Sequence, residues 1–142
     1  MDLSKLSQHD RITLGTAAAV AVTALLSISN AWGALMFLSL AAGIGAIAVI
    51  LQPMLAPTVK LPVTKAQALV GLGSVATVAT GLTALNWLEW IIEHPGKFDT
   101  IQFVAGLAAA IVLLVISFQA FKAERAATAA PTGPTAPAAP VA

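Results

Sequence analysis

Charged residues are scarce in this chain of 142 residues. Asp, Glu, Lys and Arg make up 9% of the sequence, whereas a typical soluble domain has about 25%. Hydrophobic residues account for 58%, and so few charges cannot cover the surface of a soluble protein of this size. The composition therefore excludes an ordinary soluble globular domain and indicates an integral membrane protein.

Cysteine is absent, which excludes a disulfide scaffold, a thiol nucleophile, a Cys-ligated zinc site and an iron–sulfur cluster. The net charge is only +1 and the basic residues are scattered, so a basic nucleic-acid binder is excluded as well. The blocks 12–59, 66–88 and 100–121 contain no charged residue and no His. Ion-coupled transporters and haem carriers place such groups within their spans. We therefore expect no cofactor and no metal site.

The first uncharged block is too long for one membrane span. Residues 12–52 would form a helix of about 60 Å, roughly twice the hydrocarbon thickness of a bilayer. Asn30 and Gly33 favour a tight turn, and Trp32 suits the membrane interface. The sequence therefore predicts helices at 12–29 and 34–52, the second of them ended by Pro53.

Two further helices are expected in the second half of the chain. The first covers 66–92, with Thr64 as its N-cap and a stop at His94-Pro95-Gly96. The second covers 100–122, with Asp99 as its N-cap. Residues 1–11 form a polar N-terminal segment, and the Ala-, Pro- and Thr-rich residues 123–142 are expected to be a disordered tail. The predicted class is an all-α, polytopic transmembrane four-helix bundle.

Positive charges predict the orientation of this bundle. With four spans, six of the seven Lys and Arg residues fall on one side, and Lys97 alone falls on the other. The positive-inside rule then places both termini in the cytoplasm of a multi-pass protein of the cell membrane. The aromatic belt of the outer interface would consist of Trp32, Trp87 and Trp90. A cleaved signal peptide is the alternative for the first helix, because Ser27-Ile28-Ser29 resembles a cleavage site.

Titratable residues gather only at the expected outer interface, beside these Trp residues: Glu89, Glu93, His94 and Asp99. Glu89 and Glu93 are four residues apart and share one helical face. Carboxylates beside a His could bind a metal or relay protons. The spacing matches no known zinc motif, so solvated residues at the membrane edge are the favoured interpretation.

The spans contain small and hydroxyl-bearing residues: Thr16, Thr23, Ser27, Asn30, Gly73, Thr77 and Gly81. Small residues let transmembrane helices approach closely, and hydroxyls form hydrogen bonds between helices. The alternative is a hydroxyl-lined path for a small solute. Close helix packing is the favoured interpretation. Gln102, near the end of a span, is expected at the interface.

The segment Leu6-Ser7-Gln8-His9-Asp10-Arg11-Ile12, directly followed by an apolar span, resembles the start of a group of small four-helix membrane proteins common in high-GC actinobacteria. These proteins often carry a segment like Asn30-Ala31-Trp32 between their first two helices and end in a tail like residues 126–142. This chain differs in its very short first outer loop and in lacking an aromatic pair at the end of the first helix. That group has no established activity, so the resemblance implies a layout and no functional residue.

No catalytic constellation is recognisable, because the chain has neither a Gly-x-Ser-x-Gly motif nor a Ser/His/Asp set. We therefore expect a membrane protein without enzymatic activity. It would act as a structural or accessory component that associates, within the lipid bilayer, with its own copies or with a larger membrane complex. A small-solute channel or transporter and a phage-type holin are the alternatives.

Overall fold

The computed structural model describes residues 6–29, 33–58 and 60–129. These residues form five helices and no strand. The helices are α1 (Gln8–Ser29), α2 (Leu35–Leu55), α3 (Lys65–Asn86), α4 (Leu88–Glu93) and α5 (Phe98–Ala129). Four of them, α1, α2, α3 and α5, are long and apolar enough to cross a membrane. The all-α class and the number of long helices are confirmed.

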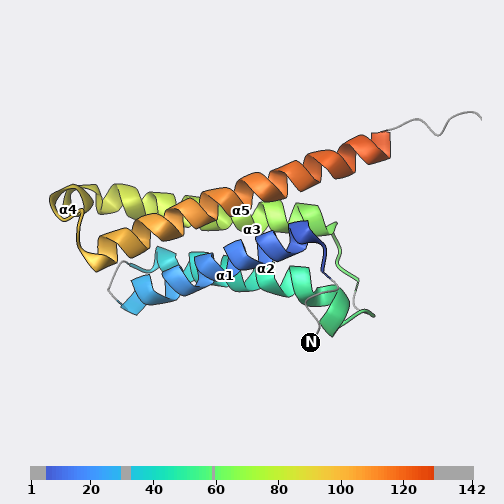
Figure 1. The fold of residues 1–142 in the computed structure, drawn as a ribbon, viewed down its shortest axis with the longest axis horizontal. Helices are drawn as coiled ribbons and strands as arrows, with labels where there is room; N and C mark the ends of the chain where they lie inside the picture. The colour runs from blue at the N-terminus through green and yellow to red at the C-terminus, as the bar shows by residue number, and fades with distance from the viewer. Residues whose placement is uncertain (1–5, 30–32, 59, 130–142) are drawn as a thin grey trace, which may run out of the picture.

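The long helices pack in a closed ring (Figure 1). Each of α1, α2 and α3 packs against the next long helix along the chain, and α5 closes the ring on α1. Successive helices run in opposite directions, so α1 and α3 begin where α2 and α5 end (Figure 1). We call this the terminal end of the bundle. The opposite end, which carries the short helix α4, is the α4 end.

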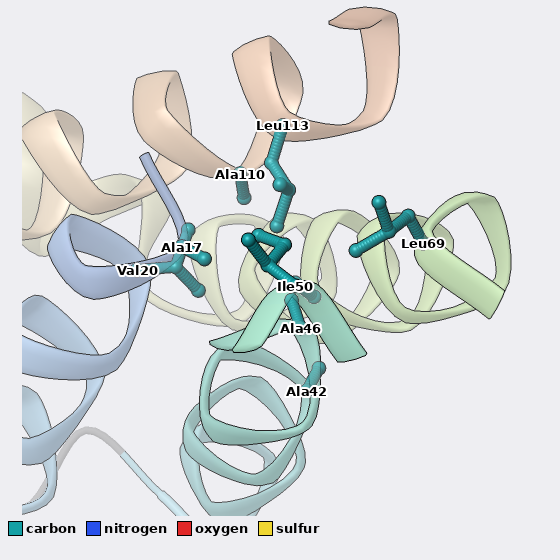
Figure 2. Close-up of a cluster of buried hydrophobic side chains, with 9 residues drawn as sticks. Ala17, Val20, Ala42, Ala46, Ile50, Leu69, Ala110 and Leu113 are labelled. Carbon is teal, nitrogen blue, oxygen red and sulfur yellow. The ribbon is translucent and has the colours of Figure 1, made fainter. Parts of the chain in front are cut away.

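The centre of the bundle is built from unusually small side chains. Ala17, Ala46, Ala76 and Ala110, one from each long helix, are fully buried. Larger side chains such as Ile50 and Leu113 fill the remaining space between the helices (Figure 2). Alanine lets helix backbones approach one another closely, which is typical of packing between transmembrane helices.

Large apolar side chains lie on the outside instead. Val22, Phe37, Val78 and Ile101, again one from each long helix, each expose more than half of their surface. In a soluble bundle the large apolar residues form the core and polar residues cover the outer faces. In this bundle, large apolar side chains cover the outer faces as well, and many of the buried side chains are alanines.

Helix α2 continues past Pro53, where the sequence predicts its end. A proline in a helix removes one backbone hydrogen bond and crowds the preceding turn. Pro53 lies in the last turn, and the helix continues for only two residues beyond it. The helix ends at Leu55, and the side chain of Gln52 donates to the carbonyl of Ala56 over 3.1 Å.

The helix expected at 66–92 is divided in two at Trp87. The backbone of Trp87 has φ −111° and ψ 16°, outside the helical region, and it ends α3 and begins α4. The break lets Trp87 and Trp90 pack against the buried side chains of Met36 and Phe103 at the α4 end. Both indole rings are partly buried in this arrangement.

Helix α5 is longer than expected at both ends and spans 32 residues. It begins at Phe98, so Asp99 lies in the first turn and is not the N-cap. It continues to Ala129, seven residues beyond the expected boundary at 122. Alanine has the highest helix propensity, and residues 123–129 are mostly alanine. Of the tail expected at 123–142, residues 130–142 lie outside the described residues.

Candidate functional site

The closest approach of α1 and α2 is at Gly43. A methyl group added to Gly43 would lie 2.9 Å from the backbone nitrogen of Ala21 and 3.1 Å from the carbonyl oxygen of Ala17. Both neighbours are backbone atoms of α1, which cannot turn away as a side chain can. Glycine is therefore required at position 43 for this spacing of the two helices.

Helices α3 and α5 combine a close approach with a hydrogen bond. A methyl group on Gly73 would lie 3.0 Å from Cα of Leu114. One turn further along α3, the single hydroxyl proton of Thr77 is shared between the carbonyl of Gly73, 2.8 Å away, and the carbonyl of Ala110 in α5, 3.1 Å away. A bond from a side chain to the backbone of another helix fixes the register of the two helices as well as their distance.

Helices α1 and α5 meet in the same way. A methyl group on Gly106 would lie 2.7 Å from Oγ1 of Thr23. The side-chain amide of Gln102 donates to the carbonyl of Thr23 over 3.4 Å and to Oγ of Ser27 over 3.5 Å. Gln102 is thus buried between two helices, close to the start of α5.

Helices α2 and α3 are joined by a pair of buried hydroxyls. Oγ of Ser39 and Oγ1 of Thr80 are 3.0 Å apart. The Thr80 hydroxyl donates its proton to the carbonyl of Ala76 over 2.7 Å, so Ser39 is the donor between the two helices. Each neighbouring pair of long helices therefore has a glycine contact, a hydrogen bond between helices, or both.

The residues singled out from the sequence are distributed unevenly among these contacts. Thr23, Ser27, Gly73 and Thr77 lie at the contacts between helices. The hydroxyl of Thr16 donates only within α1, to the carbonyl of Ile12 over 2.8 Å. A methyl group on Gly81 would meet nothing within 4 Å. Asn30 lies outside the described residues.

Most of the hydroxyl groups that a polar path would need are already engaged. Those of Thr23, Ser27, Thr80 and Thr83 donate to the carbonyl of the residue four positions earlier, over 2.7 to 2.9 Å. A hydroxyl bonded in this way has given its proton to its own helix. Two buried polar atoms, Oε1 of Gln102 and Oγ of Ser117, accept or donate no hydrogen bond within the described residues.

An aromatic cluster closes the α4 end of the bundle. The rings of Trp87 and Trp90 meet edge to face with centroids 6.4 Å apart. His94 stacks on Trp90 at 5.1 Å, and Nζ of Lys97 lies 5.6 Å from the centre of the Trp90 ring. The hydroxyl of Thr100 donates to the carbonyl of His94 over 2.8 Å and ties the turn to α5. Trp32 lies outside the described residues.

The carboxylates expected beside this cluster do not gather into a site. Glu89 and Glu93 are exposed on α4, and Asp99 is half-buried in the first turn of α5. Among the described residues, no group of three or more His, Asp or Glu side chains could hold a metal ion. Their arrangement suits solvated residues at the edge of an apolar bundle.

Charged and capping groups connect three helices at the terminal end. Thr64 caps α3 as predicted: its hydroxyl accepts from the backbone nitrogen of Gln67 over 3.2 Å. The same hydroxyl donates to Oε2 of Glu124 in α5 over 2.7 Å. Nζ of Lys65 lies 2.5 Å from Oδ1 of Asp10 and links α3 to α1. The sequence offered no sign of the Thr64–Glu124 contact, because the two residues are 60 positions apart.

Comparisons with known proteins supply no relative: no family model, no curated protein and no solved structure matches this chain.

Proposed function

We propose that this chain is a multi-pass membrane protein in which α1, α2, α3 and α5 cross the bilayer. The observation that carries the proposal is the apolar outer surface, with Phe37 and Ile101 exposed while alanines such as Ala17 and Ala110 lie in the centre. In water, this exposed apolar surface would drive aggregation. In a bilayer, lipid tails cover it, and small residues hold the helices together.

The proposed orientation places the terminal end in the cytoplasm. Five of the described basic residues belong to this end: Arg11, Lys60, Lys65, Lys122 and Arg125. At the α4 end, Lys97 is accompanied by Glu89, Glu93 and Asp99. The positive-inside rule then supports a cytoplasmic N-terminus and C-terminus.

The proposed role is that of a non-enzymatic component that associates laterally with further copies of itself. Support comes from the outer face of α1, where Ile12, Gly15, Ala19 and Val22 are all exposed at spacings of three and four residues. A methyl group on Gly15 would meet nothing within 4 Å, so this glycine serves no contact inside the bundle. A glycine and an alanine four residues apart on a lipid-facing surface let a second helix approach closely.

Light scattering of the full chain in mild detergent tests this role. We expect a dimer or larger oligomer, and we expect Gly15→Ile to shift it toward the monomer because the larger side chain blocks the approach. The matched control is Ala48→Ile, which enlarges an exposed residue on the outer face of α2. A wild-type chain that is monomeric at every concentration, or an oligomer unaffected by Gly15→Ile, would contradict the proposal.

A channel or transporter has less support. The hydroxyls that would line its path, including those of Thr23 and Thr77, donate to backbone carbonyls. Gly43 and Gly73 bring the backbones of their helices into contact where a lumen would need space. These contacts favour a closed bundle without a central path, in which the hydroxyls bond to the helix backbones.

A further inference from the structure

A groove of about 620 Å³ opens at the terminal end, where α5 continues beyond the other helices (Figure 1). Its walls come from the first turns of α1 and α3 and the last turns of α5. Small-molecule sites in proteins usually measure about 300 to 1,000 Å³. The groove is therefore large enough for the head of a lipid and the start of its chains.

The lining of the groove has an apolar and a polar part. Leu69 and Ala120 contribute apolar surface, and Asp10, Lys65 and Glu124 contribute charge. Each of these three charged residues lies just outside the uncharged block of its helix, at 12–59, 66–88 and 100–121. In a bilayer, the three would lie together at the level of the headgroups, with the apolar part of the groove toward the acyl chains. The occupant should have a polar head and an apolar tail.

The charges in the groove determine which kind of polar headgroup it can bind. The charges of Lys65 and Asp10 compensate each other, since Nζ and Oδ1 are 2.5 Å apart. Glu124 accepts a hydrogen bond from the neutral hydroxyl of Thr64 over 2.7 Å and forms no ion pair within the described part of the chain. The hydroxyl orients the carboxylate without cancelling its charge. A negative charge is thus available for a cationic group.

We propose that this groove binds phosphatidylethanolamine, an amine-bearing phospholipid. The ammonium group of the lipid donates to the carboxylate of Glu124. Lys65 has three N–H donors and uses one for Asp10, which leaves two for the lipid phosphate. Phosphatidylcholine has no N–H group to donate, and phosphatidylglycerol has no ammonium group and would bring its negative charge toward Glu124. The inference rests on the proposed location in a bilayer.

Native mass spectrometry of the full chain, purified in detergent, tests the inference. The chain is titrated with phosphatidylethanolamine, phosphatidylcholine and phosphatidylglycerol that carry identical acyl chains. We expect phosphatidylethanolamine to bind about fivefold more tightly than either of the others, the size of effect typical of one exposed charge pair. Equal binding of the three lipids, or a preference for phosphatidylglycerol, would overturn the proposal.

Glu124→Gln should abolish the preference for phosphatidylethanolamine. A Gln side chain still offers an oxygen to the Thr64 hydroxyl, so the contact between α3 and α5 is kept while the charge is removed. The matched control is Glu89→Gln, which removes an exposed carboxylate at the α4 end and should leave the preference unchanged. A preference that survives Glu124→Gln contradicts the assigned role of Glu124.

Carbonate extraction of native membranes tests the proposed membrane location independently of the lipid site. If the chain is released as a soluble protein, the proposed membrane location is wrong. If the chain stays in the membrane but the purified protein does not prefer phosphatidylethanolamine, only the lipid site is wrong.

Discussion

The hydroxyl of Thr77 in α3 donates a hydrogen bond to the backbone carbonyl of Ala110 in α5 across 3.1 Å. One turn away, Gly73 brings the backbone of α3 against Cα of Leu114. The hydrogen bond depends on this close approach, because a larger residue at position 73 would move Thr77 out of reach. A small residue and a hydroxyl therefore act together at one contact between helices.

Thr77→Val should lower the stability of the bundle by about 0.6 kcal/mol, the average for a hydrogen bond between transmembrane helices. Valine has nearly the same shape, so the loss reports the hydrogen bond rather than packing. Thermal unfolding of the purified chain, followed by circular dichroism, measures it. Thr16→Val is the control, because the Thr16 hydroxyl donates only within α1 and its loss should cost less. Equal losses for the two variants would contradict the assigned contact.

Gly43→Ala should destabilise the bundle by about 1 to 3 kcal/mol, the usual cost of an overpacked contact. The added methyl group would lie 2.9 Å from a backbone nitrogen of α1, so the two helices must separate. The same unfolding measurement applies. Gly71→Ala is the matched control: its methyl group meets nothing within 4 Å, and alanine favours the helix. If both variants are equally stable, α1 and α2 do not approach as described.

Trp90→Ala should detach α4 from the end of the bundle. The substitution removes the ring that contacts Trp87, His94 and Lys97. We expect faster hydrogen exchange of the amides of residues 88–93, while those of α2 remain protected. Trp90→Phe keeps an aromatic ring and should retain most of the protection. Unchanged exchange in Trp90→Ala would show that the cluster does not hold α4.

The sequence predicts the number of long helices because its charged residues leave three uncharged blocks, and the first of these is long enough for two spans with a turn at Asn30 and Gly33. It cannot predict which glycine meets which helix. Gly43 and Gly45 are two residues apart on α2, yet Gly43 meets α1 and Gly45 meets Leu72 of α3. Positions two apart on a helix point in nearly opposite directions, and every face of α2 is apolar. The rotation of α2 about its axis therefore cannot be predicted from its composition.

The ends of the helices are harder to predict from the sequence than the number of long helices. Pro53 does not end α2 at once: the helix continues to Leu55, and the side chain of Gln52 donates to the carbonyl of Ala56 just beyond it. At the helix break, the partly buried rings of Trp87 and Trp90 pack against Met36 of α2 and Phe103 of α5. The break at Trp87 depends on neighbours that a single stretch of sequence does not contain, whereas the end of α2 differs from the prediction by three residues.

The absence of cysteine from the native chain makes topology directly measurable, because each engineered cysteine is the only thiol present. Lys97→Cys lies at the α4 end, and Glu124→Cys lies in the last turns of α5. A membrane-impermeant maleimide is added to intact cells, and the same labelling is repeated after the cells are opened. We expect Lys97→Cys to be labelled in intact cells and Glu124→Cys to be labelled only after the cells are opened. Labelling of both cysteines, or of Glu124→Cys alone, in intact cells would contradict a bundle of four spans with cytoplasmic termini.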